Sequence, residues 1–256
     1  GFDPRTARDT GCVVIWGANP AHCGPHTFEH WFHEAPGAKI VVDPIRTETA
    51  RAADLHLQPF PGSDAALAFA LLHVLRRDGL LDDVFIAEHT VGWEELEPLL
   101  DPCAPAWGEK VTGVPAALIE QAARLYGAGP SLLWLGQGLQ RQPQGGNIMR
   151  ACALLPAATG NLGKPGAGIM YLSGYSPPDL DGTYVTASHL GPGVPAISHM
   201  DLADTLEDPE RSQALFCWNM NIAASAPRQR QLRQAMRRDD LFTVAIDLFQ
   251  TDTCDL

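Results

Sequence analysis

Short apolar runs alternate with polar breaks rich in glycine and proline through the first half of the chain. Runs of this length with β-branched or aromatic residues predict buried strands at 12–16, 39–42 and 131–135, and a shorter apolar stretch covers 55–57. Longer apolar segments predict helices at 25–34, 65–77, 82–88, 93–100, 115–126 and 149–155. Strand, helix and strand joined by short loops form a βαβ unit, so a parallel sheet is expected.

The pattern changes after the glycine-rich stretch 159–168. Residues 173–200 contain four prolines and little periodicity, which indicates a long loop or a crossover between domains. Strands are then expected at 214–218 and 241–246, on either side of a helix at 226–237. No internal repeat is evident. The fold class is therefore α/β, a Rossmann-like and mostly parallel sheet with flanking helices.

Composition narrows the range of partners. The 256 residues are 45% hydrophobic and carry a net charge of −12, so the chain can bury a large core but has no basic excess for nucleic acid. No apolar run approaches the roughly 20 residues that span a bilayer. The six cysteines are scattered and form no Cys-x-x-Cys motif, which favours reduced side chains and a cytoplasmic location.

Polar and glycine residues gather where the predicted strands end. Asn19 follows the first strand, Asp43 and Arg46 follow the second, and Gly136 to Gly138 follow the strand at 131–135. In open α/β sheets, ligands bind at this carboxyl edge. A carboxylate there can accept hydrogen bonds from a ribose or from guanine, and an arginine can hold a phosphate. The pattern indicates a nucleotide-bearing ligand.

Simpler interpretations exist for several of these residues. Asp64 or Ser63 could only cap the helix that follows, and Asp43-Pro44 could be an ordinary turn. The G-x-G-x-x-G fingerprint is absent after Ile15, and GNLGKPG lacks the first glycine and the Ser/Thr of a P-loop. Histidines at 22, 26, 30 and 33 recur at helical spacing, but solvated or capping roles are favoured and no metal site is expected.

Taken in order, several segments resemble the molybdopterin-dependent oxidoreductase family, which includes formate dehydrogenases and dimethyl sulfoxide reductases. The segments are GANP, VVDPIRTETARAADLHLQPFPGSDAAL, GQGLQRQPQGG, ATGNLGKPGAG and FTVAIDLFQTDT. The resemblance covers roughly residues 11–256. It implies a dinucleotide-binding α/β domain at 1–170 and part of a second, related α/β domain at 171–256. It also implies molybdenum held by two molybdopterin guanine dinucleotides.

The resemblance also implies roles for matching positions. In the first domain the expected cofactor-binding residues are Asn19, Asp43, Arg46, Gly62, Asp64, Gly136, Gln137, Gly138 and Arg141. In the second they are Asn219, Asn221, Asp247, Thr251 and Thr253. Two positions depart from the family pattern. Asn219 lies in a loop that usually contains glycine, and Gln142 stands where relatives often carry histidine. Catalytic residues are not identified.

The family's cysteine-rich iron–sulfur segment and its molybdenum ligand are not found in the sequence. We therefore expect an internal piece of a larger enzyme that performs two-electron redox chemistry on a small substrate, and we expect this piece to be inactive alone. The expected partners are the remaining domains of the parent chain, and electron-transfer subunits and an iron–sulfur cluster elsewhere in the parent are compatible with the resemblance. The alternatives are a non-catalytic scaffold relative and a nucleotide-binding module of another α/β enzyme, such as the central domain of thiamine-diphosphate enzymes.

Overall fold

The computed structural model describes residues 4–171, 182–185, 188–191, 193 and 195–256, and the chain divides into two compact units, 1–175 and 176–256. Within the described residues, no helix is both long and apolar enough to cross a membrane. Part of the loop or crossover expected at 173–200 lies outside the described residues. The remainder contains α11 (Gly182–Val185) and 3₁₀ turns at Ser188–Leu190 and His199–Asp201.

The first unit contains a five-stranded, entirely parallel sheet in the order β3-β2-β1-β4-β5. The strands are β1 (Cys12–Trp16), β2 (Ala38–Val42), β3 (Leu55–Leu57), β4 (Ser131–Leu135) and β5 (Gly168–Tyr171). All five residues of β1 are buried, as expected for the central strand of a sheet covered on both faces. The α/β class is confirmed. Strand β5 was not predicted, because its short sequence follows directly on the glycine-rich stretch.

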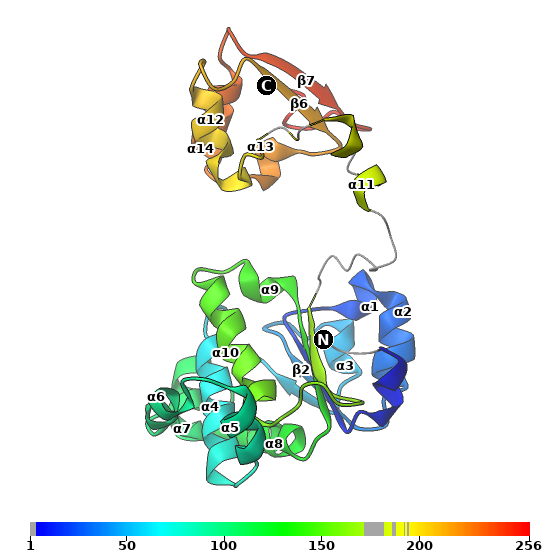
Figure 1. Ribbon diagram of the computed structural model, residues 1–256, viewed down its shortest axis with the longest axis vertical. Helices are drawn as coiled ribbons and strands as arrows, with labels where there is room; N and C mark the ends of the chain where they lie inside the picture. Colours follow the sequence, from blue (N-terminus) through cyan, green and yellow to red (C-terminus); the bar gives the residue numbers. More distant parts are fainter. Residues whose placement is uncertain (1–3, 172–181, 186–187, 192, 194) are drawn as a thin grey trace. The chain divides into compact units, whose positions relative to one another are not determined.

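Helices cover both faces of this sheet (Figure 1). The helices of the first unit are α1 (Pro20–Cys23), α2 (Pro25–Thr27), α3 (Glu48–Arg51), α4 (Asp64–Arg77), α5 (Asp83–His89), α6 (Trp93–Leu96), α7 (Pro105–Thr112), α8 (Ala116–Gly127), α9 (Gln137–Gln140) and α10 (Gly145–Ala158). The first unit also contains 3₁₀ helices at Pro4–Asp9 and Glu97–Leu100 and a π-helix at Phe28–His33. Val14 and Trp16 face α4, α8 and α10, whereas Val13 and Ile15 face the π-helix, because successive side chains of a strand point to opposite faces.

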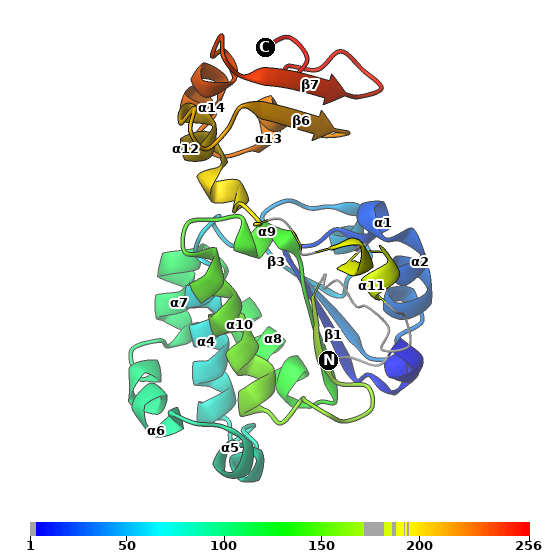
Figure 2. The same ribbon diagram turned by 45° about the horizontal axis from the view of Figure 1, so that its top comes forward.

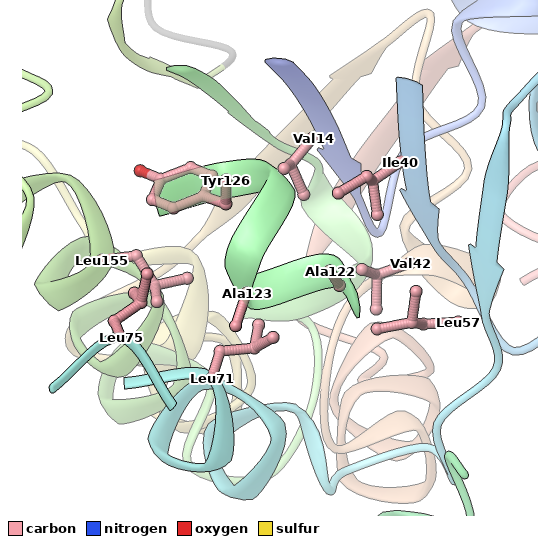
Figure 3. A pocket seen from close by; sticks show the side chains of 10 residues that line it. All are labelled: Val14, Ile40, Val42, Leu57, Leu71, Leu75, Ala122, Ala123, Tyr126 and Leu155. Carbon is pink, nitrogen blue, oxygen red and sulfur yellow. The ribbon is translucent and has the colours of Figure 1, made fainter. Parts of the chain in front are cut away.

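Figure 3 shows how closely the sheet and helices pack on the α4 side. A cavity of about 10 Å³ remains there, lined by Val14, Ile40, Val42, Leu57, Leu71, Leu75, Ala122, Ala123, Tyr126 and Leu155. This volume is close to that of a single water-sized probe, and the lining is apolar. The cavity is therefore a packing gap and not a ligand site.

The second unit is smaller. Its parallel strands β6 (Ala214–Trp218) and β7 (Phe242–Ile246) are joined through α13 (Ile222–Ser225) and α14 (Gln229–Met236), and α12 (Leu202–Glu207) packs against α14 (Figure 2). Leu206, Cys217 and Leu232 belong to a core on one face of this sheet. The opposite face is exposed: Phe216, Trp218 and Phe242 keep 67%, 76% and 65% of their surface accessible.

Several predicted helices differ in extent from those found. The segment expected as a helix at 25–34 is a short α-helix followed by the π-helix, and the one expected at 93–100 changes to 3₁₀ geometry at Glu97, where Pro98 follows. The helix predicted at 149–155 extends over Gly145–Ala158, because Gly145 and Pro156 are tolerated within it. Helices α7 and α12 were missed, as were the four-residue helices α1, α3, α9 and α13. Helix α7 begins at a proline and contains Gly108.

Candidate functional site

The carboxyl edge of the first sheet contains a topological switch point. From β1 the chain passes to β2 on one side, and it later returns to place β4 on the other side of β1. The loops that follow β1 and β4 therefore diverge at this edge, which is where open α/β sheets bind ligands. A pocket of about 180 Å³ lies there. It is lined by Gly17, Val42, Asp43, Pro44, Ile45, Pro59, Pro61, Asp64, Gly138, Leu139 and Gln142.

Asp64, the first residue of α4, is a buried carboxylate with 5% of its surface exposed. The indole Nε1–H of Trp16 donates to its Oδ1 at 2.8 Å, and Gln142 Nε2 donates to its Oδ2 at 3.2 Å. Ser63, at the N-cap position, makes no side-chain cap and instead donates to the Phe60 carbonyl. Asp64 is therefore held by residues from two other segments of the site, and helix capping does not account for its contacts.

Asp43 lies at the end of β2 and is 9% exposed. Its Oδ1 accepts from the Ile45 N–H at 2.9 Å, so the simple turn interpretation also holds, and its carbonyl is bonded by His56 Nε2 at 2.9 Å. Burial raises the pKa of the Asp43 carboxyl, and the negative charge of Asp64 raises it further, whereas the Ile45 N–H and His56 lower it. Among the described residues neither carboxylate forms an ion pair. Both are suited to a ligand that brings hydrogen-bond donors.

Glycines allow the loops after β1 and β4 to touch. The Gly136 N–H donates to the Trp16 carbonyl at 2.7 Å, and a Cβ on Gly136 would lie 2.0 Å from the Gly17 carbonyl oxygen. Gly138 N–H donates to the same Gly17 carbonyl at 3.2 Å. Gly17 itself has φ +66°, a left-handed conformation that favours glycine. This close approach brings the two loops together beside the pocket.

Asn19 ends the loop after β1 and is bonded to Thr49, in α3. The Thr49 hydroxyl donates to Asn19 Oδ1 at 2.7 Å and accepts the Ala21 N–H at 3.1 Å. Thr49 is fully buried, and Asn19 is partly exposed. A buried hydroxyl needs its hydrogen bonds satisfied, so the pair fixes the loop against the next βα connection.

The remaining predicted residues of the first unit lie outside this group. Arg46 is exposed beside Asp43 and does not line the pocket. Gly62, with φ +91°, lies where an added Cβ would be 3.6 Å from Gln142 Oε1. Gln137 and Arg141 each precede a residue that lines the pocket, but they bond to each other, with Arg141 Nη2 donating to Gln137 Oε1 at 2.7 Å, and neither lines the pocket. The structure therefore brings together Asp43, Asp64 and Gly138, with Gly62 and Gly136 adjoining them.

The second unit repeats the contacts of the Asn19–Thr49 pair. Thr253 Oγ1 donates to Asn221 Oδ1 at 2.8 Å and accepts the Ala223 N–H at 3.1 Å. Thr253 is 2% exposed. Asn219 has φ +51° and its N–H donates to the Ile246 carbonyl at 2.7 Å, as the Gly17 N–H donates to the Val42 carbonyl at 2.9 Å.

This equivalence has a sequence counterpart. Trp16-Gly-Ala-Asn-Pro-Ala aligns with Trp218-Asn-Met-Asn-Ile-Ala, and Asp43-x-x-x-Thr-x-Thr aligns with Asp247-x-x-x-Thr-x-Thr. The expectation that the chain has no internal repeat was wrong. Only a few positions are shared and the intervening segments differ in length, so the repeat is visible once the hydrogen bonds are known.

Asp247 and Thr251 take the positions of Asp43 and Thr47 in this repeat. Asp247 Oδ1 accepts from the N–H groups of Leu248 at 2.7 Å and Phe249 at 3.4 Å. The Thr251 hydroxyl lies 3.4 Å from Cys254 Sγ. The residues predicted to bind cofactor in the second unit thus follow the ends of β6 and β7, namely Asn219, Asn221, Asp247, Thr251 and Thr253.

Three contributors to the site were not singled out from the sequence as binding residues: Trp16, Thr49 and Gln142. Thr49 could have been found from the Asp-x-x-x-Thr-x-Thr spacing that residues 43–49 share with residues 247–253. Nothing in the sequence indicates that Trp16 Nε1 reaches a carboxylate 48 positions away. Across the described residues, no group of three or more His, Cys, Asp and Glu side chains is arranged to hold a metal ion.

Comparison with known proteins extends these observations. Residues 6–255 match the sequence profile of the family described as molybdopterin oxidoreductase. The chain is 34% identical over 99% of its length to the probable oxidoreductase YoaE of Bacillus subtilis, and 31% identical over 97% of its length to the F420-dependent formate dehydrogenase 1 subunit alpha of Methanococcus maripaludis. It covers 38% and 40% of these relatives, so it spans about two fifths of their length.

Among solved structures, the acetylene hydratase from Pelobacter acetylenicus has the same fold. The superposition has a TM-score of 0.75 at 22% identity and covers 95% of this chain and 39% of the hydratase. At this identity the likeness concerns the fold alone.

Proposed function

Because this chain belongs to the molybdopterin oxidoreductase family, we propose that it is the part of a molybdenum enzyme that binds two molybdopterin guanine dinucleotides, one in each unit. The proposed units are 1–170 and 171–256. The parent enzyme would carry out a two-electron redox reaction on a small substrate. The cofactor supplies the redox chemistry when bound, and this chain supplies its position and electrostatic surroundings.

The observation that carries the proposal is the pair of buried carboxylates, Asp43 and Asp64, on one pocket at the switch point. Guanine presents adjacent N–H donors, which a carboxylate can accept in pairs, and charge-assisted bonds of this kind are strong. The exposed Arg46, three positions after Asp43, is available for a phosphate. The Gly136–Gly17 contact, which leaves no room for a Cβ, holds the loops after β1 and β4 together beside the pocket.

The observed hydrogen bonds indicate the role that each residue of the pocket would have in this proposal. Trp16 and Gln142 orient the Asp64 carboxylate, the Ile45 N–H orients that of Asp43, and the glycines shape the loop after β4. The corresponding assignments in the second unit are Asn219, Asn221, Asp247, Thr251 and Thr253. Gln137 and Arg141 are assigned to the loop nearest the pterin.

Cofactor content of the parent enzyme tests the proposal. Asp43→Ala and Asp64→Ala each remove a charged acceptor, a loss of about 1.5–3 kcal/mol, or about 10- to 150-fold in affinity. We expect purified variants to release less GMP on acid hydrolysis than the wild type, whereas Asp239→Ala, an exposed carboxylate in the second unit, should release as much. Full GMP content in both pocket variants would refute the carboxylate assignment.

The molybdenum and guanine nucleotide content of the wild-type parent protein distinguishes this proposal from the alternative of a non-catalytic scaffold. A parent protein that contains neither molybdenum nor guanine nucleotide after purification would be a non-catalytic relative. The family match favours either of these over a module of an unrelated α/β enzyme. We further propose the remaining domains of the parent chain and electron-transfer subunits as partners. The six cysteines, all without disulfide bonds, support the cytoplasm as the compartment.

A further inference from the structure

Two adjoining hollows lie on the surface of the first unit, where α5, α6 and the end of α10 meet, and each has a volume of about 280 Å³. Thr90 and Trp93 line both hollows, and we call the two together the Trp93 groove. The Asp82 N–H, at the start of α5, donates to the carbonyl of Ala158, the last residue of α10, at 2.9 Å. This bond joins two of the helices whose side chains form the walls of the groove.

The two halves of the groove differ in chemistry. One half is lined mostly by apolar side chains, among them Leu96, Leu154 and Ala157. The other half is lined by Asp83 and Glu94, whose side chains are both exposed. A surface of this kind fits a ligand that is apolar at one point and cationic at the next.

Trp93 contributes to both halves. Its side chain packs against the core of the first unit and is still partly exposed. Among the described residues its indole N–H has no hydrogen-bond acceptor, whereas the Thr90 hydroxyl already donates to the Ile86 carbonyl at 2.7 Å. Tryptophan is enriched among the residues that anchor protein interfaces, because it combines a large apolar ring with one donor. The face of its ring also attracts a Lys or Arg side chain.

The charge around the groove is negative. Residues 82–97 contain six acidic residues and no Lys or Arg. In the part of the chain that the structure describes, none of these six side chains forms an ion pair with a Lys or Arg. The arginines nearest in sequence, Arg76 and Arg77, pair with carboxylates outside this stretch. A surface of this charge repels nucleic acid and acidic proteins and attracts a cationic partner.

We propose that the Trp93 groove docks a cationic, amphipathic segment of another polypeptide. An apolar side chain of that segment fills the half lined by Leu96 and Leu154. A Lys or Arg side chain contacts Asp83 and Glu94 in the other half. This inference goes beyond the proposed function, because the groove shares no lining residue with the pocket at the sheet edge. The pocket lies before the start of α10 and the groove at its end, so the length of this 14-residue helix, roughly 20 Å, separates them.

Binding of a defined peptide to the purified parent enzyme tests the proposal. The probe is a fluorescein-labelled 12-residue peptide in which Leu and Arg alternate, and fluorescence anisotropy gives its Kd. Trp93→Ala should weaken binding by at least about 10-fold. Asp83→Asn/Glu94→Gln should weaken it by about 3- to 10-fold. Glu210→Gln/Asp239→Asn, which removes two exposed carboxylates of the second unit, should leave the Kd unchanged.

A matched peptide with Glu in place of Arg should not bind. If Trp93→Ala does not fold, the double variant of Asp83 and Glu94 decides, because both carboxylates are exposed and their exchange leaves the core intact. Equal affinity for the two peptides, or equal affinity in the groove and control variants, would overturn the inference. A wild type that does not bind the Leu/Arg peptide, as when a segment of the parent chain already covers the groove, would also overturn it. None of these results bears on GMP content, which tests the proposed function separately.

Discussion

Asn219 adopts in the second unit the left-handed backbone conformation that Gly17 adopts in the first, with φ +51° and +66°. Each residue follows the tryptophan that ends a strand, and each donates its N–H to the last carbonyl of the neighbouring strand. Asparagine is the residue other than glycine that tolerates this conformation best. Asn219 is therefore compatible with the backbone path that Gly17 follows in the first unit.

This equivalence predicts the outcome of two substitutions. Asn219→Gly should change the free energy of unfolding by less than about 1 kcal/mol, because glycine is unstrained at positive φ. Asn219→Val should lower it by about 1–3 kcal/mol, because a β-branched residue is strained there. Urea unfolding followed by circular dichroism provides the measurement, and equal stability of the two variants would contradict the equivalence.

Trp16→Phe isolates the hydrogen bond to Asp64. The phenyl ring keeps most of the buried contacts of Trp16 but leaves Asp64 Oδ1 without its donor in a buried site. We expect a loss of about 1.5–3 kcal/mol in the free energy of unfolding. The double variant Trp16→Phe/Asp64→Asn should show a coupling of comparable size in a double-mutant cycle. Additive effects would mean that the bond contributes nothing.

Gly136→Ala tests the contact between the two loops. Its Cβ would lie 2.0 Å from the Gly17 carbonyl oxygen, so the backbone must shift, and we expect destabilisation of about 3 kcal/mol or more together with reduced GMP content. Gly146→Ala is the control, because nothing lies within 4 Å of its added Cβ. That variant should stay within about 1 kcal/mol of the wild type in thermal unfolding.

Asp43 should make stability depend on pH. The pKa of Asp43 in the folded protein is raised above its usual value of 3.8, because burial disfavours the charged carboxylate. The folded state is therefore favoured by the protonated carboxyl below pH 3.8, and this stabilisation is lost as the pH rises through the folded pKa. In the cofactor-free protein, Asp43→Asn should therefore melt about 1–3 °C above the wild type at pH 7, with a smaller difference at pH 4. Thermal melts between pH 4 and 8 measure this. A difference that grows toward acid pH would contradict the direction of the shift.

The exposed face of β6 and β7 should make the isolated 256-residue chain self-associate. Phe216, Trp218 and Phe242 form an apolar surface on a parallel sheet, a sheet type normally covered on both faces. Sedimentation velocity should show association that depends on concentration and that Trp218→Ser/Phe242→Ser reduces. Val91→Ser, at a residue that is 99% exposed on another surface, should leave association unchanged.

Limited proteolysis examines the same unit by a different route. Cuts should concentrate after about residue 171 while the first unit survives, because the second unit has a smaller core and one uncovered sheet face. Preferential digestion of the first unit, or equal protection of both, would show that the proposed division is wrong.

The isolated chain should also lack formate oxidation, since this sequence contains neither cluster cysteines nor an identified metal ligand.

The sequence was sufficient for every strand except β5, and for the edge of the sheet at which the site forms. Runs such as Val13-Val14-Ile15 are buried because they are the centre of a parallel sheet, and the polar residues after them must then lie together at its carboxyl edge. Asp43 was identified on that basis and Asp64 from the family resemblance, and the pocket contains both. Helix α4 was equally clear, since its apolar residues continue over several turns.

The contacts that hold the site depend on long-range packing and could not be predicted. Trp16 looks like any buried aromatic residue until α4 is placed over the sheet, and Thr49 looks like an ordinary helix residue until α3 lies beside the β1 loop. Gln137 and Arg141 show the converse. Their loop is at the expected edge, but they bond to each other and not to the pocket.

The contacts at the strand ends of each unit come from one continuous stretch of the chain. The pocket of the first unit uses residues between Trp16 and Gln142, and the repeated pair of the second uses residues between Trp218 and Thr253. Protein synthesis proceeds from the N-terminus, and domains generally fold as units as they emerge. The contacts of the first unit can therefore form while the residues that make those of the second unit are still untranslated.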